Sequence, residues 1–240
     1  MDKSTLGDRM KGYERVSKNS LMCRTPVIIR LDGKAFHTYT RKCDKPFDTD
    51  LHWLRSNTLK YLCENIQGCI MGYSQSDEIT LVLKDWQTFS SQAWFGNEVQ
   101  KICSVTASMA SAKWANLVGL LSITEEDKLE KFPHFAIFDA RCFNLPISEV
   151  VNCLLWRQQD WERNSVQMIA RSVWSQKQCH GKSNRELITR LEVEKGIIWG
   201  QLPTWQKRGE FWFRGDLRDA PRFNEARDWL EEALYQQDEE

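Results

Sequence analysis

The stretch Pro26-Val-Ile-Ile-Arg-Leu-Asp-Gly33 is predicted to be a buried strand that ends at a turn. β-Branched side chains dominate it, and Asp-Gly is a turn signal. Further along the chain, the apolar runs Cys69–Tyr73 and Ile79–Leu83 flank the polar segment Ser74–Glu78, which indicates a hairpin. A fourth run, His134–Phe138, is predicted to be another strand.

Two segments between these strands show the helical period of apolar residues, namely Thr49–Asn65 and Trp94–Ala115. The order strand, helix, strand, strand, helix, strand predicts a split βαβ unit, which is a four-stranded sheet with helices on one face. The predicted class is therefore α+β, with a ferredoxin-like βαββαβ core, an arrangement that polymerase palms also have. Nucleotide cyclases and RNA-binding modules share this arrangement, so the fold alone does not settle the function.

The chain after Pro146 is predicted to be mainly helical. Ser148 is the expected N-cap of a first helix, and Ser183-Asn-Arg-Glu186 matches a capping box for a helix that stops at Gly196. Helices are expected over residues 148–164, 165–177, 183–196 and 226–237, a surface loop or short helix over 124–131, and strands or loops over 197–214. We therefore divide the chain into a palm-like catalytic core, residues 1–146, and a mainly helical extension, residues 147–240, packed on it as one structural unit.

The composition is that of a globular protein without a uniform charge. Of 240 residues, 41% are hydrophobic, and 33 basic side chains balance 33 acidic ones. This excludes a uniformly basic nucleic-acid coat, but residues 157–222 carry 13 basic against 8 acidic side chains and can orient a polyanion. No run approaches the roughly 18 apolar residues of a membrane span, and the charged start lacks the apolar core of a signal peptide. The expected location is the cytoplasm.

The eight cysteines show neither zinc-site spacing nor a Cys-x-x-Cys pair. Several lie in apolar surroundings, where a free thiol behaves as a small hydrophobic group. We expect reduced, structural thiols, with zinc binding and disulfides as the alternatives.

Asp32 and Asp77 are the candidate metal ligands. Asp32 ends the first predicted strand and Asp77 lies in the hairpin turn, and the first and third strands are neighbours in this topology. Two carboxylates at one sheet edge repel each other unless a cation lies between them. Hard oxygen ligands favour magnesium, and two such ions stabilise the attacking and leaving oxygens of phosphoryl transfer. The Gly33 carbonyl can supply a further ligand. The alternative is that both acidic motifs are ordinary turn chemistry.

Several longer motifs carry a family resemblance. They resemble those of the tRNA-histidine guanylyltransferase superfamily, with the bacterial-type guanylyltransferase-like proteins as the nearest branch. In order, they are Ile29-Arg-Leu-Asp-Gly-Lys-Ala-Phe-His37, Tyr73-Ser-Gln-Ser-Asp-Glu-Ile79, Phe138-Asp-Ala-Arg-Cys-Phe143, Trp156-Arg-Gln-Gln-Asp-Trp-Glu-Arg-Asn-Ser165 and Leu202-Pro-Thr-Trp-Gln-Lys-Arg-Gly209.

The resemblance implies a nucleotidyltransferase that extends tRNA at its 5′ end, in the 3′–5′ direction. A 5′-monophosphate is first activated with ATP or GTP, and the 3′-hydroxyl of an incoming nucleoside triphosphate then attacks the activated phosphate. The resemblance also implies two Mg²⁺ ions held by Asp32 and Asp77, one of them also by the Gly33 carbonyl, and a homotetramer.

The same resemblance implies nucleotide contacts from the segment Asp32, Gly33, Lys34, Ala35, Phe36 and His37, and a phosphate hydrogen bond from Ser76. Glu78 is expected to support the metal ions, with a purely structural hairpin role as the alternative. Further candidates for the nucleotide site are Lys45, Asp48, Lys207 and Arg208, for which an ordinary solvated loop is the alternative. Positive charge is needed at the last two to neutralise phosphate.

Three arginines, Arg157, Arg163 and Arg171, are candidate RNA contacts because they spread along a predicted helix. Their alternative role is pairing with Asp160 and Glu162 at helical spacing.

One departure from the family pattern bears on the substrate. Eukaryotic members that add guanosine to histidine tRNA carry a His-x-Asn-Asn-Leu-Tyr-Asn-like motif, and Trp161-Glu-Arg-Asn-Ser-Val-Gln-Met168 stands in its place. Templated repair of 5′-truncated tRNA is therefore favoured over addition of a guanosine at position −1 of histidine tRNA. The remaining alternatives are a palm-fold nucleotide cyclase and a non-catalytic RNA-binding module.

Overall fold

The computed structural model describes residues 5–124, 128–132 and 135–236 of the chain. Its strands are β1 (Val27–Gly33), β2 (Cys69–Gln75), β3 (Glu78–Leu83), β4 (Phe138–Asn144), β5 (Glu210–Phe213) and β6 (Asp216–Asp219). Its α-helices are α1 (Thr5–Val16), α2 (Phe36–Tyr39), α3 (Thr49–Asn65), α4 (Val99–Thr124), α5 (Lys128–Lys131), α6 (Ile147–Val173), α7 (Gln176–Cys179), α8 (Asn184–Lys195), α9 (Thr204–Lys207) and α10 (Arg227–Tyr235).

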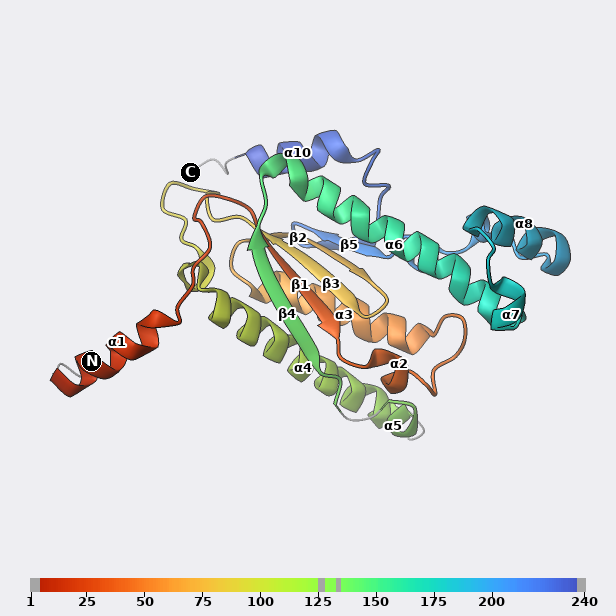
Figure 1. Ribbon diagram of the computed structural model, residues 1–240, viewed down its shortest axis with the longest axis horizontal. Coiled ribbons are helices and arrows are strands. Elements are labelled where there is room, and N and C mark those ends of the chain that lie inside the picture. The colour runs from red at the N-terminus through yellow and green to blue at the C-terminus, as the bar shows by residue number, and fades with distance from the viewer. Residues whose placement is uncertain (1–4, 125–127, 133–134, 237–240) are drawn as a thin grey trace.

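The strands form one antiparallel sheet in the order β4-β1-β3-β2-β5-β6. Helices α3 and α4 cover one face, and α6 and α10 cover the other, so the sheet is the middle layer of three (Figure 1). None of the helices within the described ranges combines the length and the apolar character needed to cross a bilayer.

Each face of the sheet has its own apolar core because side chains alternate along a strand. Ile29, Leu31 and Leu81 point toward α3 and α4, where they meet buried residues such as Leu59 and Trp114. On the opposite face, Ile28 of β1, Met71 of β2 and Val82 of β3 pack against α6 and α10. Leu154 of α6 and Leu230 of α10 belong to the same apolar cluster.

The first three predicted strands are confirmed, and the fourth was placed too early. β4 begins at Phe138 rather than ending there, and pairs with β1 over Val27–Gly33. The predicted strand began at His134, which lies outside the described residues. The error arose because β4 alternates charged and small residues, Asp139-Ala-Arg141-Cys, which does not resemble an apolar strand. The predicted five-residue hairpin turn is also shorter, because only Ser76 and Asp77 separate β2 from β3.

Two predicted helices after Pro146 are one continuous helix, α6. The predicted break at Ser165 is wrong because this residue is buried and its hydroxyl accepts a 3.1 Å hydrogen bond from the Trp199 indole N–H. Ser148 is not the N-cap, since Pro146 occupies that position. The capping box of Ser183 and Glu186 and the left-handed stop at Gly196 are confirmed.

Two helix boundaries in the core also differ. The helix predicted from Trp94 begins at Val99, because Phe95 and Gly96 have positive φ angles of 52° and 59° and form a 3₁₀ turn. It then continues to Thr124, and the charged segment that follows contains the short helix α5.

The segment after Pro146 is mainly helical but also adds β5 and β6 to the sheet. The expectation of helices on one face only is therefore incomplete, since α6 and α10 cover the second face. The division at residue 146 remains a prediction. What the structure shows is that residues on both sides of that boundary share one sheet and one core.

Candidate active site

Asp32 and Asp77 lie at the same end of the central strands, which we call the acidic edge of the sheet. Asp32 is opposite Glu78 in the β1–β3 register, and the Gly33 N–H donates a 3.1 Å hydrogen bond to the Asp77 carbonyl oxygen. The β2–β3 turn that carries Asp77 is tight, because Ser76 adopts a positive φ of 48°. Two-residue hairpin turns require this kind of backbone conformation.

The electrostatics of Asp77 suit a bound cation. Burial raises the pKa of the Asp77 carboxyl, a hydrogen bond from Ser76 opposes this, and the charges of Asp32 and Glu78 raise it further. Among the described residues, no group of three or more His, Cys, Asp and Glu side chains forms a metal site. Two carboxylates and a backbone carbonyl nevertheless fit Mg²⁺, which takes few protein ligands and completes its shell with water and phosphate oxygens.

The loop after β1 presents its backbone beside these acids. A Cβ on Gly33 would come within 2.2 Å of the Phe36 ring, and Ala35 has a positive φ of 54° ahead of α2. Phe36 is buried against Trp114 and Phe138 and anchors the loop in the core. Lys34 and His37 are exposed, and the Lys34 backbone N–H donates a 2.8 Å hydrogen bond to the Ile137 carbonyl oxygen.

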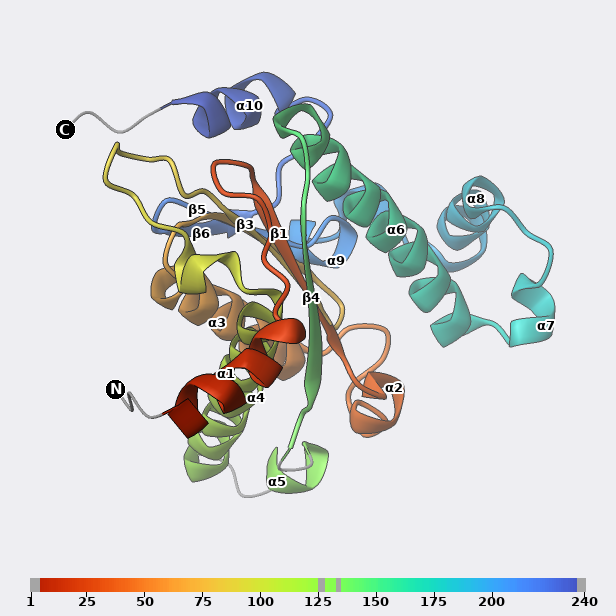
Figure 2. The same ribbon diagram turned by 60° about the vertical axis from the view of Figure 1, so that its left-hand side comes forward.

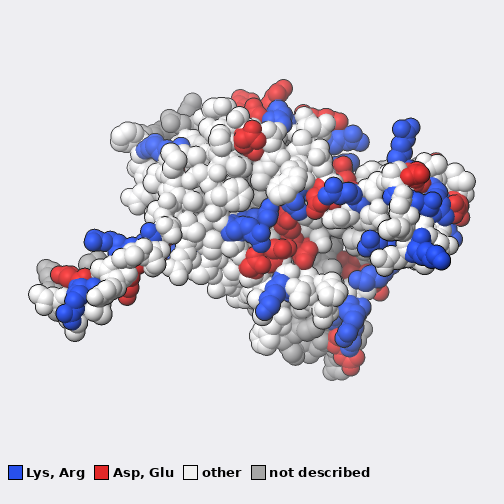
Figure 3. Space-filling view, in the orientation of Figure 1, with Lys and Arg blue, Asp and Glu red and all other residues white. Residues whose placement is uncertain are grey.

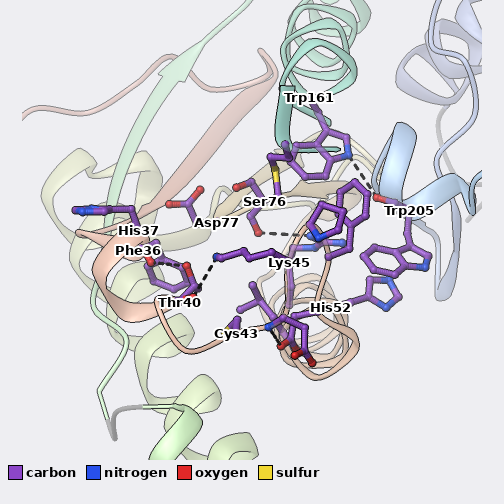
Figure 4. A pocket seen from close by; sticks show the side chains of 17 residues that line it. Phe36, His37, Thr40, Cys43, Lys45, His52, Ser76, Asp77, Trp161 and Trp205 are labelled. Atoms are coloured by element: carbon purple, nitrogen blue, oxygen red, sulfur yellow. Dashed lines mark hydrogen bonds between the residues drawn. The ribbon is translucent and has the colours of Figure 1, made fainter. Parts of the chain in front are cut away.

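A pocket of about 230 Å³ opens beside Asp77 (Figure 4). Phe36, His37 and Thr40 lie on one side of it, next to Asp77 and Ser76, and aromatic side chains lie on the other. The lining residues are Phe36, His37, Thr40, Cys43, Asp44, Lys45, Pro46, Phe47, Asp48, Leu51, His52, Arg55, Ser76, Asp77, Trp161, Met168 and Trp205. Since Trp161, Met168 and Trp205 follow residue 146, both parts of the chain build the pocket.

The aromatic side of the pocket is held together by ring contacts. His52 stacks on Trp205 with 4.1 Å between ring centroids, and Phe47 lies edge-on to both Trp161 and Trp205. The Trp161 indole N–H donates to the Trp205 carbonyl oxygen over 3.3 Å.

A buried charge network lies behind this wall. The Glu210 carboxylate accepts a hydrogen bond from Ser56 and lies 3.1 Å from His52 Nε2 and 3.7 Å from Arg55 Nη2. Arg55 Nη1 also lies 3.5 Å from the Ser76 carbonyl oxygen, so this network reaches the turn that carries Asp77.

The predicted nucleotide contacts Lys45 and Asp48 both line the pocket, but they differ in exposure. Lys45 is exposed and its Nζ donates to the Thr40 carbonyl oxygen over 3.2 Å. Asp48 is buried, caps α3 through the Leu51 N–H at 2.9 Å, and forms a 2.7 Å ion pair with Lys131. Asp48 therefore shapes the wall of the pocket.

The structure does not bring Lys207 and Arg208 into the lining of this pocket. Lys207 is buried and donates to the Gly200 carbonyl oxygen, and burial together with Arg208 and Arg222 lowers its pKa. Arg208 Nε lies 3.5 Å from the Ala220 carbonyl oxygen. Their neighbour Trp205 is the part of this motif that reaches the pocket.

Glu78 and the predicted RNA-contacting arginines are also placed. Glu78 is buried and forms a 2.6 Å ion pair with Arg157, which binds Asp160 at 3.0 Å as well. Arg163 is exposed and pairs with the same Asp160, and Arg171 is exposed beside a shallow groove. Arg157 is thus the least accessible of the three arginines.

The sequence analysis missed His52, Arg55, Trp161, Trp205 and Glu210 as parts of the site. The available signal was Arg55, which follows Leu51 by four residues and therefore falls on the apolar stripe of α3. A charged residue at a predicted core position indicates a buried partner. Nothing in the sequence indicates that this partner is Glu210 on β5.

Comparisons with known proteins agree with this architecture. Residues 7–146 match the family profile described as tRNAHis guanylyltransferase. A solved bacterial tRNAHis guanylyltransferase-like protein in complex with ATP is 40% identical, with a TM-score of 0.89, and the match covers 96% of this chain and all of that one. An uncharacterized protein of Acanthamoeba polyphaga mimivirus is 30% identical over 85% of this chain and 75% of its own length. The tRNA(His) guanylyltransferase of Schizosaccharomyces pombe is 26% identical over 85% of this chain and 78% of its own.

The sheet, the acidic edge and these relatives together define the class of the protein, which is a nucleotidyltransferase. Within that class, the chain belongs to the tRNAHis guanylyltransferase family.

Proposed function

We propose that the protein repairs 5′-truncated tRNA by template-dependent, 3′–5′ nucleotide addition. In the first step, the 5′-monophosphate of the RNA attacks the α-phosphate of ATP or GTP, and pyrophosphate leaves. In the second, the 3′-hydroxyl of an incoming nucleoside triphosphate attacks the activated phosphate, and a nucleoside monophosphate leaves. The observation that carries the proposal is the convergence of Asp32 and Asp77 beside a pocket that has Asp77 and Ser76 at one end and aromatic side chains at the other.

The proposed core is a polymerase palm with two Mg²⁺ ions. The order β4-β1-β3-β2, with α3 and α4 on one face, is the arrangement expected of a ferredoxin-like unit. Asp32, Asp77 and the Gly33 carbonyl would hold the ions, which would neutralise charge on the transferring phosphate. Glu78 supports this site indirectly, because its ion pair with Arg157 fixes α6 against the catalytic edge.

The pocket would take the activating nucleotide with its phosphates toward Asp77 and its base toward the aromatic wall. Ser76 lies next to Asp77 and His37 is exposed at the same end, where a phosphate needs donors. Phe47, Trp161 and Trp205 offer ring faces and edges to a purine at the other end. The ATP complex of the bacterial relative supports a purine nucleotide in this family.

For the RNA, we propose Arg163 and Arg171 as phosphate contacts, because both are exposed on α6. A homotetramer and a cytoplasmic location remain predictions from the resemblance and from the sequence. Addition of a single guanosine to histidine tRNA is the second candidate, supported by the names of curated relatives.

The decisive assay supplies purified protein, Mg²⁺, ATP and the four nucleoside triphosphates with a tRNA that lacks its first nucleotide. We expect extension by the nucleotide that pairs with the opposite strand. Extension of full-length histidine tRNA by guanosine alone would favour the second candidate. Cyclic nucleotide formed from ATP or GTP without RNA would indicate a cyclase and contradict both.

A further inference from the structure

A row of acids and a row of arginines lie side by side on the face of the sheet that α6 covers. Residues opposite each other in antiparallel strands share a face. Asp139 is opposite Asp32, and the next such pair along the same face is Arg141 opposite Arg30. The backbone positions of the two rows are about 7 Å apart, since each strand residue rises about 3.4 Å. Their side chains meet between the rows, where Arg141 Nη2 lies 2.9 Å from Asp139 Oδ1. Figure 3 shows basic and acidic side chains meeting on this side of the molecule.

Beside the arginine row stands an exposed tryptophan. Trp156 on α6 is 53% exposed, which is unusual for so large an apolar side chain. Guanidinium carbons of Arg157 and Arg30 lie 4.4 Å and 5.4 Å from its ring centroid. Arg157 is in turn paired with Glu78, so the indole lies directly beside the catalytic edge.

A groove of about 280 Å³ continues from Trp156 away from the acids. Its walls are Phe143 at the end of β4, Leu145 in the connection that follows, and Glu149, Asn152, Cys153 and Trp156 of α6. β4 is the edge strand of the sheet, and Figure 2 shows α6 running away from its end. The groove therefore opens on the same side as the two charged rows.

We propose that this groove binds an unpaired nucleobase of the RNA end, stacked against Trp156, while Arg30 and Arg141 contact the adjoining phosphate. The proposal rests on the proposed function and names where its RNA end lies. Unpaired RNA bases stack on aromatic rings and on arginine planes, and phosphates seek guanidinium groups. The order groove, arginine row, acid row would then direct a terminal phosphate toward Asp32 and Asp77.

A fluorescent base tests the proposal directly. A short RNA duplex carries 2-aminopurine as a one-nucleotide overhang opposite the 5′ end, and stacking quenches its fluorescence. We expect quenching by the wild-type protein. Trp156→Leu should lose most of the quenching and bind the overhang about tenfold more weakly, the effect of one lost stacking partner. Trp156→Phe should keep most of both.

The matched control is Trp53→Leu, which removes a 39% exposed indole from α3, on the other face of the sheet. It should change neither quenching nor affinity. Arg141→Gln should weaken binding and reduce the salt dependence by about one phosphate contact. The proposal is overturned if the Trp156→Leu variant quenches the fluorescence as strongly as the wild type does. It is also overturned if the substitution weakens binding of a blunt duplex as much as binding of the duplex with the overhang.

Failure of this inference can be told from failure of the proposed function. If the wild type extends truncated tRNA but the Trp156→Leu variant shows unchanged quenching, only the groove assignment is wrong. If overhang binding depends on Trp156 but no RNA is extended, the groove stands and the proposed reaction is wrong. Thermal unfolding and ATP binding of each variant confirm that the fold and the nucleotide pocket are intact.

Discussion

The two faces of β1 differ in what their side chains do. Val27, Ile29 and Leu31 point toward α3 and α4 and are all buried in one apolar cluster. On the other face, only Ile28 belongs to an apolar cluster, and Arg30 and Asp32 follow it toward the end of the strand. A single strand therefore fixes the core with one face and carries the proposed site residue Asp32 on the other. A slip of one residue in its pairing would exchange the two roles.

β3 repeats this division. Ile79, Leu81 and Leu83 are buried toward α3 and α4, whereas Glu78 and Thr80 are polar residues on the α6 face. The polar positions of both strands lie at the same end of the sheet, because Asp32 is opposite Glu78. Substitutions on the two faces should consequently have separable effects on activity and on stability.

The largest effect is expected from Asp77→Asn, at the end of the sheet where we propose the catalytic site. Loss of one carboxylate ligand should reduce nucleotide addition about a thousandfold, since metal ions supply several kcal/mol of charge stabilisation. The fold should not weaken, because the substitution removes repulsion with Asp32 and Glu78. Rates of extension and urea unfolding curves measure the two quantities. Retained activity would refute the role of Asp77. Asp139→Asn, which removes another carboxylate at this end of the sheet, is measured in the same two assays for comparison.

Glu210 is the exception on the apolar face and provides the next prediction. Burial alone would raise the pKa of Glu210, but hydrogen bonds from His52 and Ser56 and the charge of Arg55 lower it. Glu210→Gln should destabilise the fold by about 3–5 kcal/mol, because Arg55 is left buried without a counter-charge. The difference from the wild type should shrink as the pH falls through the lowered pKa of Glu210.

The double variant Arg55→Met, Glu210→Met sharpens that result. Replacing a buried ion pair by apolar side chains is often close to neutral, so the double variant should be more stable than Glu210→Gln. If all variants unfold at the same urea concentration, the network does not stabilise this face.

Leu31→Ala tests the apolar face itself. The side chain is fully buried, and its truncation should cost about 2–5 kcal/mol of the free energy of unfolding. Activity per folded molecule should remain near that of the wild type, measured at a temperature where the variant is folded. A large fall in that activity would mean that the two faces are not separable. Val193→Ala, at an exposed position on α8, is the control for loss of apolar atoms.

The same division explains how much of the fold the sequence predicted. The elements β1, β2, β3 and the helix Thr49–Asn65 were predicted correctly, because the buried apolar residues of a strand or a helix leave a clear periodicity in the sequence. β4 was misplaced because Asp139 and Arg141, on the face that α6 covers, interrupt the apolar pattern of a buried strand. Functional positions are where local rules are expected to fail.

The candidate site was predictable only where topology determines it. Pairing of neighbouring strands was enough to place Asp32 beside Asp77. The aromatic wall was not predictable, because Trp205 and Trp161 reach the pocket through long-range packing between α9, α6 and α3. The same holds for Lys207, whose burial against Gly200 depends on a loop that no local pattern specifies.

The smallest expected effect is a pH dependence at Asp77. Its folded-state pKa is raised above the ordinary value of 3.8, first by burial and then by Asp32 and Glu78. A raised acid pKa means that the folded state binds the proton more tightly, so stability is lost as the pH rises from 3.8 through the raised value. Asp77→Asn lacks this loss, and its advantage over the wild type should therefore grow across that window and then level off. Mg²⁺ should reduce the advantage at neutral pH, since a cation between the carboxylates offsets their repulsion. Urea midpoints of both proteins along a pH series, with and without Mg²⁺, measure this. A stability difference that stays constant with pH would mean that the Asp77 carboxylate is solvated in the folded protein. Repulsion among Asp32, Asp77 and Glu78 would then be too weak for a metal ion to offset measurably.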